Sequence, residues 1–246
     1  MKFGLIGFPL GHSFSKAFFE SKFQNENLTG FTYDNFPVED IDSIKALLQS
    51  DAFGFNITIP YKSVILDYIN DIDEAAFKIG AVNTLVRTSE DSWKGYNTDW
   101  SGFRESLVEW LMDSPIPQKA LILGTGGAAK AIRFTLHQLG IITSSVSSQG
   151  HGDYAYEGLS EDLIAEHHLI INATPLGMMP ETETAPLIPY EALTEKHWLF
   201  DLVYNPANTL FLARGAQMGA RIKNGLDMLH LQAEHAWLIW KKYGKF

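Results

Sequence analysis

The sequence predicts an α/β protein of two domains, and two observations support this prediction. Short apolar runs typical of strands alternate with stretches of helical periodicity along the chain of 246 residues. This alternation is typical of parallel or mixed sheets that helices cover on both faces. The chain then divides near residue 100 into an N-terminal α/β half and a second half, in which a proline-punctuated segment at residues 113–117 precedes a strand and a glycine-rich turn.

The elements follow in chain order. In the first half we predict strands at 3–8, 31–36, 53–59, 81–87 and 93–96, and helices around 18–23, 41–48, 61–69 and 73–79. After a helix at 102–112, the second half has predicted strands at 120–123, 144–148, 169–172, 199–202 and 221–223, with helices at 128–139 and 226–240. Continuous apolarity in the strand 120–123 indicates burial on both faces.

The glycine-rich turn has the pattern G-x-G-x-x-A, formed by Gly124, Gly126 and Ala129. Small residues let the backbone turn tightly and approach a pyrophosphate, and the following helix offers free N–H groups and the positive end of its dipole. We therefore predict a dinucleotide-binding unit. The alternative is a glycine-rich loop between strand and helix in another kind of α/β protein. The turn residues expected to contact the cofactor are Gly124, Thr125, Gly126, Gly127 and Ala128.

Composition narrows the function. The chain has no cysteine, which excludes disulfides, thiolate metal sites and cysteine nucleophiles and is compatible with a reducing cytoplasm. Its net charge of −10 disfavours a general nucleic-acid binder. The apolar runs are too short to span a membrane, and the N-terminus has no signal-peptide layout, so we expect no membrane segment. The eight histidines form no metal-binding pattern, so no metal site is expected.

Lys62 and Thr58 lie at the end of a predicted strand, which stops at Pro60, and Lys62 starts the next predicted helix. A cation is electrostatically disfavoured at a helix N-terminus, so the lysine needs another reason to be there. A lysine in a cleft can orient a hydroxyl and exchange a proton. The alternative is a solvated surface lysine.

Asp99 lies between a strand and a helix at the predicted domain boundary. Its plain interpretation is a helix N-cap, which Asp forms well. Together with Lys62 it would make an acid/base pair suited to moving a hydroxyl proton while a hydride leaves the same carbon.

Ser13 and Ser15 flank Phe14 before the first helix, and two hydroxyls two residues apart face the same side of an extended loop. Such a pair suits a polyol or a carboxylate, and helix capping is the alternative. His12 beside them is interpreted as structural. In the second half, residues 172–178 and 201–206 end two strands and are candidates to contact a nicotinamide and its ribose, or plain strand-terminating turns.

Taken together, these motifs resemble those of the shikimate dehydrogenases. His12-Ser13-Phe14-Ser15 is similar to the family's H-S-x-S motif, and residues 56–62 are similar to its N-V-T-x-P-x-K motif. Further matches follow in order along nearly the whole chain: 80–84, 97–99, 124–129, 172–178, 201–204, and 225–229 with Gln232.

The resemblance implies a cytoplasmic enzyme of chorismate and aromatic amino acid biosynthesis that interconverts 3-dehydroshikimate and shikimate by hydride transfer with NADP(H). It implies substrate-binding roles for Ser13, Ser15, Thr58, Lys62, Asn83, Asp99, Tyr204 and Gln232, with Lys62 and Asp99 catalytic. It adds Ser147, Ser148, Thr174, Leu202 and Gly225 to the expected cofactor-binding residues.

The resemblance also implies that the final helix folds back onto the first domain. The expected domains are therefore residues 1–100 with 226–246, which bind substrate, and residues 101–225, a dinucleotide-binding domain of the Rossmann type.

Two positions depart from the family pattern. Lys16 replaces the proline that usually follows H-S-x-S, and is either an extra cation near the substrate carboxylate or a solvent-facing helix residue. After the second cofactor strand, the relatives that use NADP place an arginine to meet the 2′-phosphate, whereas an NAD-binding protein places an acidic residue there. This chain has Ser147, Ser148 and Gln149, with His151 and Asp153 further on. We favour NADP, with NAD not excluded.

Three alternatives remain. A paralogue that oxidises quinate, or both substrates, would differ in the side chains around Ser13 and Ser15. A methylene-tetrahydrofolate dehydrogenase shares the two-domain plan but lacks the H-S-x-S and N-T-D motifs. A catalytically silent dinucleotide-binding sensor has no need of both Lys62 and Asp99. The expected partner is a small-molecule substrate, without nucleic acid or membrane, and both a monomer and a homodimer fit the composition.

Overall fold

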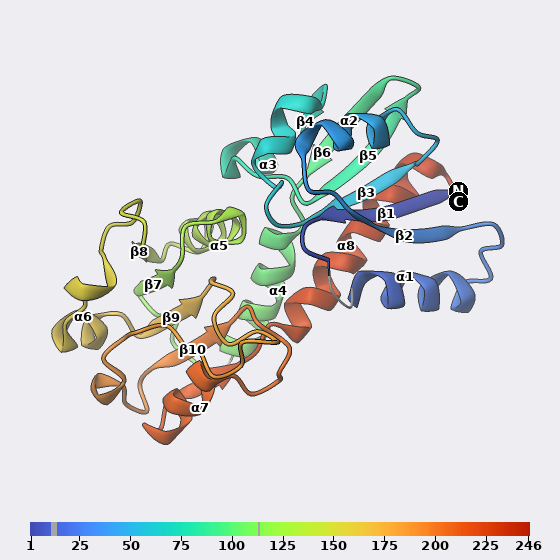
Figure 1. Ribbon diagram of the computed structural model, residues 1–246. Coiled ribbons are helices and arrows are strands. Elements are labelled where there is room, and N and C mark those ends of the chain that lie inside the picture. The colour runs from blue at the N-terminus through green and yellow to red at the C-terminus, as the bar shows by residue number, and fades with distance from the viewer. Residues whose placement is uncertain (11–13, 113) are drawn as a thin grey trace. The chain divides into compact units, whose positions relative to one another are not determined.

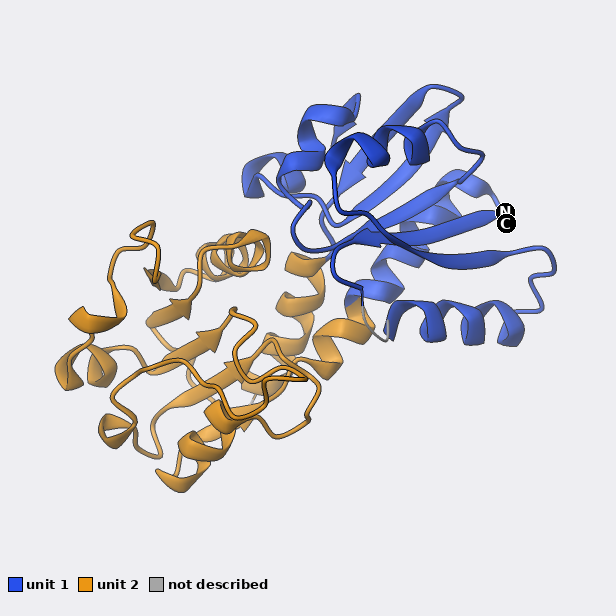
Figure 2. Cartoon of the chain, in the orientation of Figure 1, with its two compact units in different colours: residues 1–98, 232–246 blue, residues 99–231 orange. Residues whose placement is uncertain are grey.

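The chain forms two compact units, each with its own sheet. A computed structural model describes residues 1–10, 14–112 and 114–246. Unit 1 comprises Met1–Thr98 and Gln232–Phe246, and unit 2 comprises Asp99–Leu231 (Figure 2). In both units a sheet is covered by helices (Figure 1), which confirms the predicted α/β class.

The sheet of unit 1 is mixed and six-stranded in the described residues, in the order β2-β1-β3-β5-β6-β4. The strands β1, β2 and β3 run parallel, whereas β5 is antiparallel to both β3 and β6. Its elements are β1 (Lys2–Gly7), α1 (Phe14–Asn25), β2 (Thr32–Pro37), α2 (Ile41–Leu48), β3 (Gly54–Ile57), the 3₁₀ helix η1 (Val64–Tyr68), β4 (Asp71–Ile72), α3 (Glu74–Ile79), β5 (Thr84–Ser89) and β6 (Ser92–Tyr96).

Both faces of this sheet are buried. Successive side chains of a strand point to opposite faces, so Phe3 and Leu5 of β1 join one core cluster and Ile6 joins another. The Ile6 cluster includes Ile44 of α2 and Ile65 of η1, whereas the Phe3 cluster lies against α1 and the C-terminal helix. This double burial explains why β1 has no polar side chain after its exposed first residue, Lys2.

The sheet of unit 2 is parallel and five-stranded in the described residues, in the order β11-β10-β9-β7-β8. Its elements are α4 (Asp99–Leu111), β7 (Lys119–Leu123), α5 (Gly127–Gln138), β8 (Ile142–Val146), the 3₁₀ helix η2 (Tyr156–Gly158), α6 (Glu161–Glu166), β9 (Leu169–Asn172), the 3₁₀ helix η3 (Tyr190–Ala192), β10 (Trp198–Asp201), α7 (Leu210–Gln217) and β11 (Arg221–Lys223).

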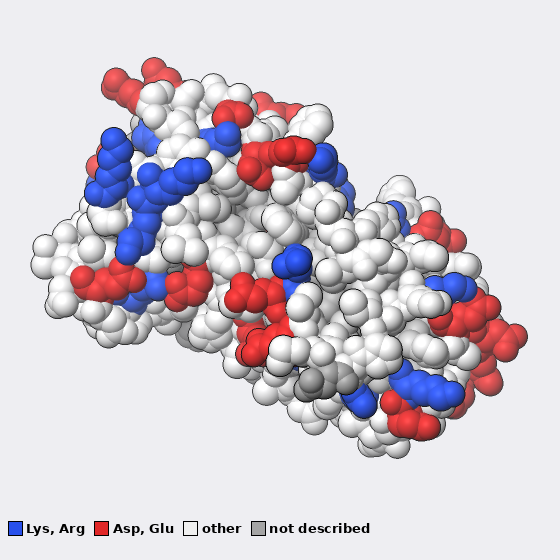
Figure 3. Space-filling model, turned by 180° about the vertical axis from the view of Figure 1, so that it is seen from behind, with Lys and Arg blue, Asp and Glu red and all other residues white. Residues whose placement is uncertain are grey.

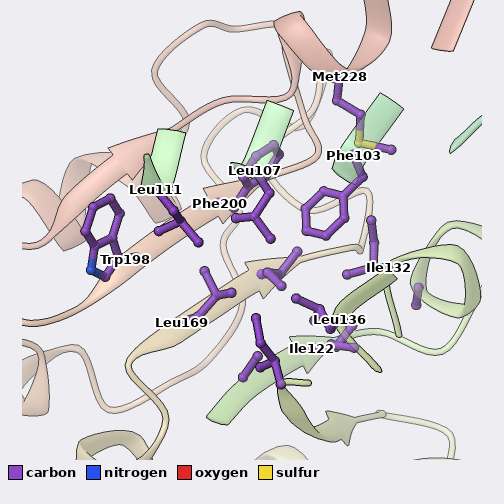
Figure 4. Packing of buried hydrophobic residues seen from close by; sticks show 14 residues of the cluster. Phe103, Leu107, Leu111, Ile122, Ile132, Leu136, Leu169, Trp198, Phe200 and Met228 are labelled. Carbon is purple, nitrogen blue, oxygen red and sulfur yellow. The ribbon is translucent and has the colours of Figure 1, made fainter. Parts of the chain in front are cut away.

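One face of this sheet packs against α4 and α5. Figure 4 shows Phe103, Leu107 and Leu111 of α4 and Ile132 and Leu136 of α5 over side chains of the strands. The strand residues in this cluster include Ile122, Leu169, Trp198 and Phe200. The opposite face is covered by α6 and α7, through residues such as Ile164 and Phe211. Helices thus bury both faces, as a parallel sheet requires.

The last helix, α8 (Leu226–Gly244), begins in unit 2 and ends in unit 1. Trp240 is fully buried, its indole N–H donates to the Leu85 carbonyl at 2.9 Å, and its ring lies 4.6 Å from that of Phe3. Lys22 of α1 forms an ion pair with Glu234 of α8 at 2.7 Å. The expected return of the final helix to the first domain is confirmed.

Several element boundaries differ from the prediction. Residues 61–63 form a turn, and the 3₁₀ helix η1 starts only at Val64, so the helix predicted from residue 61 is wrong. The turn is held by side chains: the Tyr61 hydroxyl donates to the Val38 carbonyl at 2.6 Å, and that of Ser63 to the Gly80 carbonyl at 3.1 Å. Helix α4 starts three residues earlier than predicted, and β8 starts and ends two residues earlier.

The described surface mixes both charges. On the face that Figure 3 shows, Lys and Arg side chains lie among Asp and Glu side chains, so the net charge of −10 is not gathered into one patch there. Among the described residues, no helix is long and apolar enough to cross a bilayer.

Candidate active site

In unit 1 the loops that follow β1 and β3 leave the same edge of the sheet. β1 pairs with β2 on one side and β3 on the other, the arrangement in which open α/β sheets bind ligands. Phe8 N–H donates to the Ile59 carbonyl and Thr58 N–H to the Ile6 carbonyl, both at 2.9 Å. A Cβ at Gly7 would lie 2.3 Å from Thr58 Cγ2, so the glycine lets the loops meet. The loop that leads to Ser15 thus begins beside Thr58.

A network of hydrogen-bonded polar side chains starts at Ser15, in the first turn of α1. Burial raises the pKa of the Tyr33 hydroxyl, and a hydrogen bond with the Ser15 side chain opposes that rise. Tyr33 in turn donates to Asn56 Oδ1 at 2.8 Å. Asn56 Nδ2 donates to the Asn83 carbonyl and to Thr84 Oγ1, both at 3.3 Å. Ser15 is therefore connected to the middle of the sheet. Its predicted partner Ser13 lies outside the described residues.

The network of hydrogen bonds continues through Asn83, which is 2% exposed. Its Oδ1 accepts from Thr98 N–H at 2.6 Å and from Thr84 Oγ1 at 3.1 Å, and its Nδ2 donates to Thr98 Oγ1 at 3.0 Å. Asn83 Nδ2 also lies 3.4 Å from Gln232 Oε1 on α8. The structure thus joins three predicted substrate residues, Ser15, Asn83 and Gln232, in one hydrogen-bonded network.

Lys62 is half-buried in the turn before η1. The Lys62 carbonyl accepts a hydrogen bond from Val82 N–H at 2.7 Å. Because Asn83 follows Val82 in the sequence, this bond places the backbone of Lys62 close to that of Asn83. The side chains of Tyr61 and Ser63 are also hydrogen-bonded, so the three successive residues 61–63 are each held in place. The half-burial favours a positioned lysine over a fully solvated one.

Asp99 and Tyr204 belong to unit 2. Asp99 is the first residue of α4 and is 5% exposed, and a carboxylate in the first turn of a helix is favoured by the helix dipole. Tyr204 follows β10, and burial raises the pKa of its half-buried hydroxyl.

The glycine-rich turn of unit 2 lies at the point where the strand order reverses, because β7 pairs with β8 on one side and β9 on the other. Gly124 has φ +112°, which favours glycine, and a Cβ there would be 3.1 Å from the Ala173 carbonyl oxygen. Gly126 caps α5, and a Cβ built on it meets no described atom within 4 Å. The backbone at the N-terminus of α5 is therefore unobstructed at Gly126, the position at which a dinucleotide-binding turn approaches a pyrophosphate.

The other predicted cofactor residues of unit 2 fall into three places. Thr174 donates through its N–H and hydroxyl to Asn172 Oδ1, at 3.1 and 2.6 Å, and Asn172 donates to Asp201 Oδ1 at 2.9 Å. Gly225 packs on Leu202, since a Cβ at 225 would be 2.3 Å from the Leu202 carbonyl oxygen. Ser147 and Ser148 follow β8, the first buried and the second exposed.

Lys16 pairs with Asp34 at 3.1 Å and lies 3.7 Å from Glu20, so its charge is met on the surface of α1 and β2. This favours the helix-surface interpretation over an extra cation beside the substrate carboxylate.

Six network residues were not predicted as site residues: Tyr33, Asn56, Thr84, Thr98, Asn172 and Asp201. Asn56, Thr98, Asn172 and Asp201 stand inside the quoted motifs, so their place there was a signal. Thr84 also ends the quoted motif 80–84, whereas Tyr33 had no such signal, because it meets Asn56 only through the folded sheet.

Comparison with known proteins gives consistent matches. The family model of the shikimate dehydrogenase substrate binding domain matches residues 5–85. A shikimate dehydrogenase (NADP(+)) of Desulforamulus reducens is 34% identical, over 96% of this chain and 88% of that protein. The structure of shikimate 5-dehydrogenase from Thermus thermophilus in complex with NADP(H) and shikimate has a TM-score of 0.84 at 29% identity, covering 98% of this chain and 94% of that one. Quinate dehydrogenase from Corynebacterium glutamicum in complex with NAD has a TM-score of 0.84 at 26% identity, covering 100% and 94%.

Proposed function

The chain belongs to the shikimate dehydrogenase family, and on this premise we propose that it interconverts 3-dehydroshikimate and shikimate with NADP(H). The observation that carries the proposal is the hydrogen-bonded network joining Ser15, Asn83 and Gln232. It sets polar groups from α1, from the residue before β5 and from α8 around one region of unit 1. A buried polar network is retained at little cost only when its members are paired, and such networks orient side chains strictly.

We propose that unit 1 supplies most of the residues that bind the substrate. In this assignment Ser13 and Ser15 hold the carboxylate, and Asn83, Lys62 and Asp99 hold the ring hydroxyls, with Thr58, Tyr204 and Gln232 completing the substrate set. The paired amide of Asn83 supports this role, since its orientation is fixed by Thr98 and Thr84. Fixed donors and acceptors orient a substrate at no further entropic cost.

Lys62 and Asp99 are the proposed catalytic pair. In this proposal Lys62 is the group that exchanges a proton with the reacting hydroxyl, and Asp99 binds that hydroxyl. Positioned proton transfer contributes about 10²–10⁴-fold to a rate. The nicotinamide of NADP(H), when bound, accepts or supplies the hydride.

Unit 2 is the proposed cofactor-binding part. We assign the pyrophosphate to the N-terminus of α5, which the clearance around Gly126 supports, and Thr174, Leu202 and Gly225 lie at the ends of the neighbouring strands. The reaction belongs to chorismate and aromatic amino acid biosynthesis, and we propose that the chain carries it out in the cytoplasm as a monomer or homodimer.

The test of the assignment is Lys62→Ala. We expect kcat for shikimate oxidation to fall by about 10²–10⁴-fold while KM changes much less, because the lysine acts on the reacting proton. Initial rates of nicotinamide reduction measure both constants. Lys78→Ala is the matched control: Lys78 is exposed and pairs with Glu74 at 2.6 Å, and its loss should leave kcat unchanged. Near-normal turnover in the Lys62 variant would refute the assigned role.

A further inference from the structure

The turn after β8 folds back tightly on that strand. Ser147 N–H donates to the Tyr154 carbonyl and Tyr154 N–H to the Ser145 carbonyl, both at 3.0 Å. Gly152 makes this approach possible, because a Cβ there would be 2.9 Å from the Ser145 carbonyl oxygen. Asp153, between these contacts, is thereby placed beside Ser145 near the carboxyl end of β8.

Asp153 and Arg133 form an ion pair at this position. Ser145 N–H, Ser145 Oγ and Arg133 Nη2 lie 2.7, 2.8 and 3.0 Å from the same oxygen, Asp153 Oδ2. Arg133 Nη2 also donates to Ser145 Oγ at 2.8 Å. The hydrogen bonds from Ser145, with a smaller contribution from Arg133, hold the pKa of the Asp153 carboxyl below its usual range. At neutral pH the carboxylate is therefore charged, and the guanidinium that approaches β8 from α5 is already neutralised.

This geometry affects how the site distinguishes NADP from NAD, because the two cofactors differ only by a phosphate on the adenosine ribose. That ribose is held after the second strand of a dinucleotide-binding unit, where a guanidinium meets the phosphate and a carboxylate suits the free hydroxyl. Here the turn offers the exposed Ser148 and the buried Ser147, whose hydroxyl accepts from Gln149 N–H at 3.1 Å. A neutral hydroxyl lacks the positive charge and the bidentate geometry with which a guanidinium binds a phosphate.

The N-terminus of α5 offers the pyrophosphate its usual backbone N–H groups, whereas the turn at residues 147–153 contains no arginine or lysine for the 2′-phosphate. Resting on the proposed function, we propose that the Arg133–Asp153 pair makes the cofactor site nearly indifferent to the 2′-phosphate, so that NAD binds within about tenfold of NADP. The carboxylate withholds Arg133 and adds a negative charge to the turn that the phosphate would approach. Two single substitutions should each restore discrimination, one by supplying a guanidinium and one by releasing the existing one.

The test measures binding of NADP⁺ and NAD⁺ by titration calorimetry, which needs no turnover. In the unaltered protein we expect dissociation constants within about tenfold of each other. Ser148→Arg should shift the ratio toward NADP⁺ by at least about tenfold, the usual effect of one charge-assisted hydrogen bond. Asp153→Asn should shift it in the same direction by several-fold, with NAD⁺ affinity little changed.

Glu166→Gln is the matched control for Asp153→Asn. Glu166 pairs with Lys119 at 2.6 Å, and Lys119 is the first residue of β7, at the end of that strand away from the glycine-rich turn. The substitution therefore removes one negative charge, as Asp153→Asn does, but away from the cofactor turn. The ratio should not move in this variant. A preference for NADP⁺ above about 100-fold in the unaltered protein, or equal shifts in both acidic variants, would overturn the inference while leaving the proposed function intact. Binding of neither nucleotide would overturn both.

Discussion

Single polar residues at the ends of central strands are buried in both units, and each is held by several hydrogen bonds. Asn83 in unit 1 and Asp201 in unit 2 are 2% and 0% exposed. Asp201 accepts from Thr209 Oγ1, from Asn172 Nδ2 and from Val203 N–H. A buried polar group without such partners would destabilise the fold by its full desolvation penalty. The hydrogen-bond networks therefore fix the strand ends from which the site loops depart.

Asp201 gives a pH-dependence with a definite sign. Burial raises its pKa to about 6, although the Thr209, Val203 and Asn172 hydrogen bonds act in the opposite direction. Between the unfolded pKa and about 6 the folded state holds the extra proton, so the stabilising contribution of this carboxyl is lost as the pH rises through that window.

The variant Asp201→Asn cannot ionise at this position. We expect the difference in unfolding free energy between the variant and the unaltered protein to move by about 2 kcal/mol in favour of the variant from about pH 4.5 to about pH 7.5. Urea unfolding of both proteins at the two pH values measures the difference. A difference that stays constant with pH would show that the Asp201 pKa is not raised.

The sequence signals at this scale were uneven for a physical reason. Lys62, Asn83 and Asp99 stand inside recognisable motifs, so their candidacy was visible in the chain. The bond from Tyr33 to Asn56 joins residues on β2 and β3, which meet only because β1 lies between them in the sheet order. Local pattern carries no information about such a pair.

At the scale of elements, strands were predicted more reliably than short helices. Strands buried on both faces are continuous apolar runs, and β9, which is buried at all four residues, was predicted with the boundaries that the structure has. The edge strand β11 was predicted with its observed boundaries too, although it is largely exposed. Helix α7 was not predicted, and it contains Gly215, where a Cβ would be 2.3 Å from Leu199 Cδ2. The glycine allows close packing of the helix on the sheet but lowers its helix propensity, so tertiary packing overrides the local signal. Strand β4 has two residues and no pattern to detect.

Helix α8 tests how much one element contributes to unit 1. We expect Trp240→Ala to cost about 3–5 kcal/mol of unfolding free energy, because it removes a fully buried ring and the bond from its indole N–H to Leu85. Chemical denaturation followed by circular dichroism measures it.

The control for this helix is Leu238→Ala, since Leu238 is 60% exposed on the same element. An exposed substitution of this kind changes stability by about 0.5 kcal/mol or less. Equal effects of the two substitutions would contradict the assigned anchoring role of Trp240.

At the scale of the whole molecule, the chain combines a family membership with a departure from the family's usual cofactor signal. The residues proposed to bind substrate include Lys62, Asn83 and Asp99, whereas the turn after β8 has Ser148 and the Arg133–Asp153 pair. The substrate assignment and the cofactor preference therefore rest on different side chains and can be tested separately.

The most direct measurement is a panel of initial rates with shikimate and quinate, each with NADP⁺ and NAD⁺. We expect oxidation of shikimate with both nucleotides, at a higher kcat/KM than quinate with either. Quinate differs by a hydroxyl near its carboxylate, the part of the substrate assigned to Ser13 and Ser15. Faster oxidation of quinate, or folded protein that oxidises neither substrate, would contradict the central claim that this chain acts as a shikimate dehydrogenase.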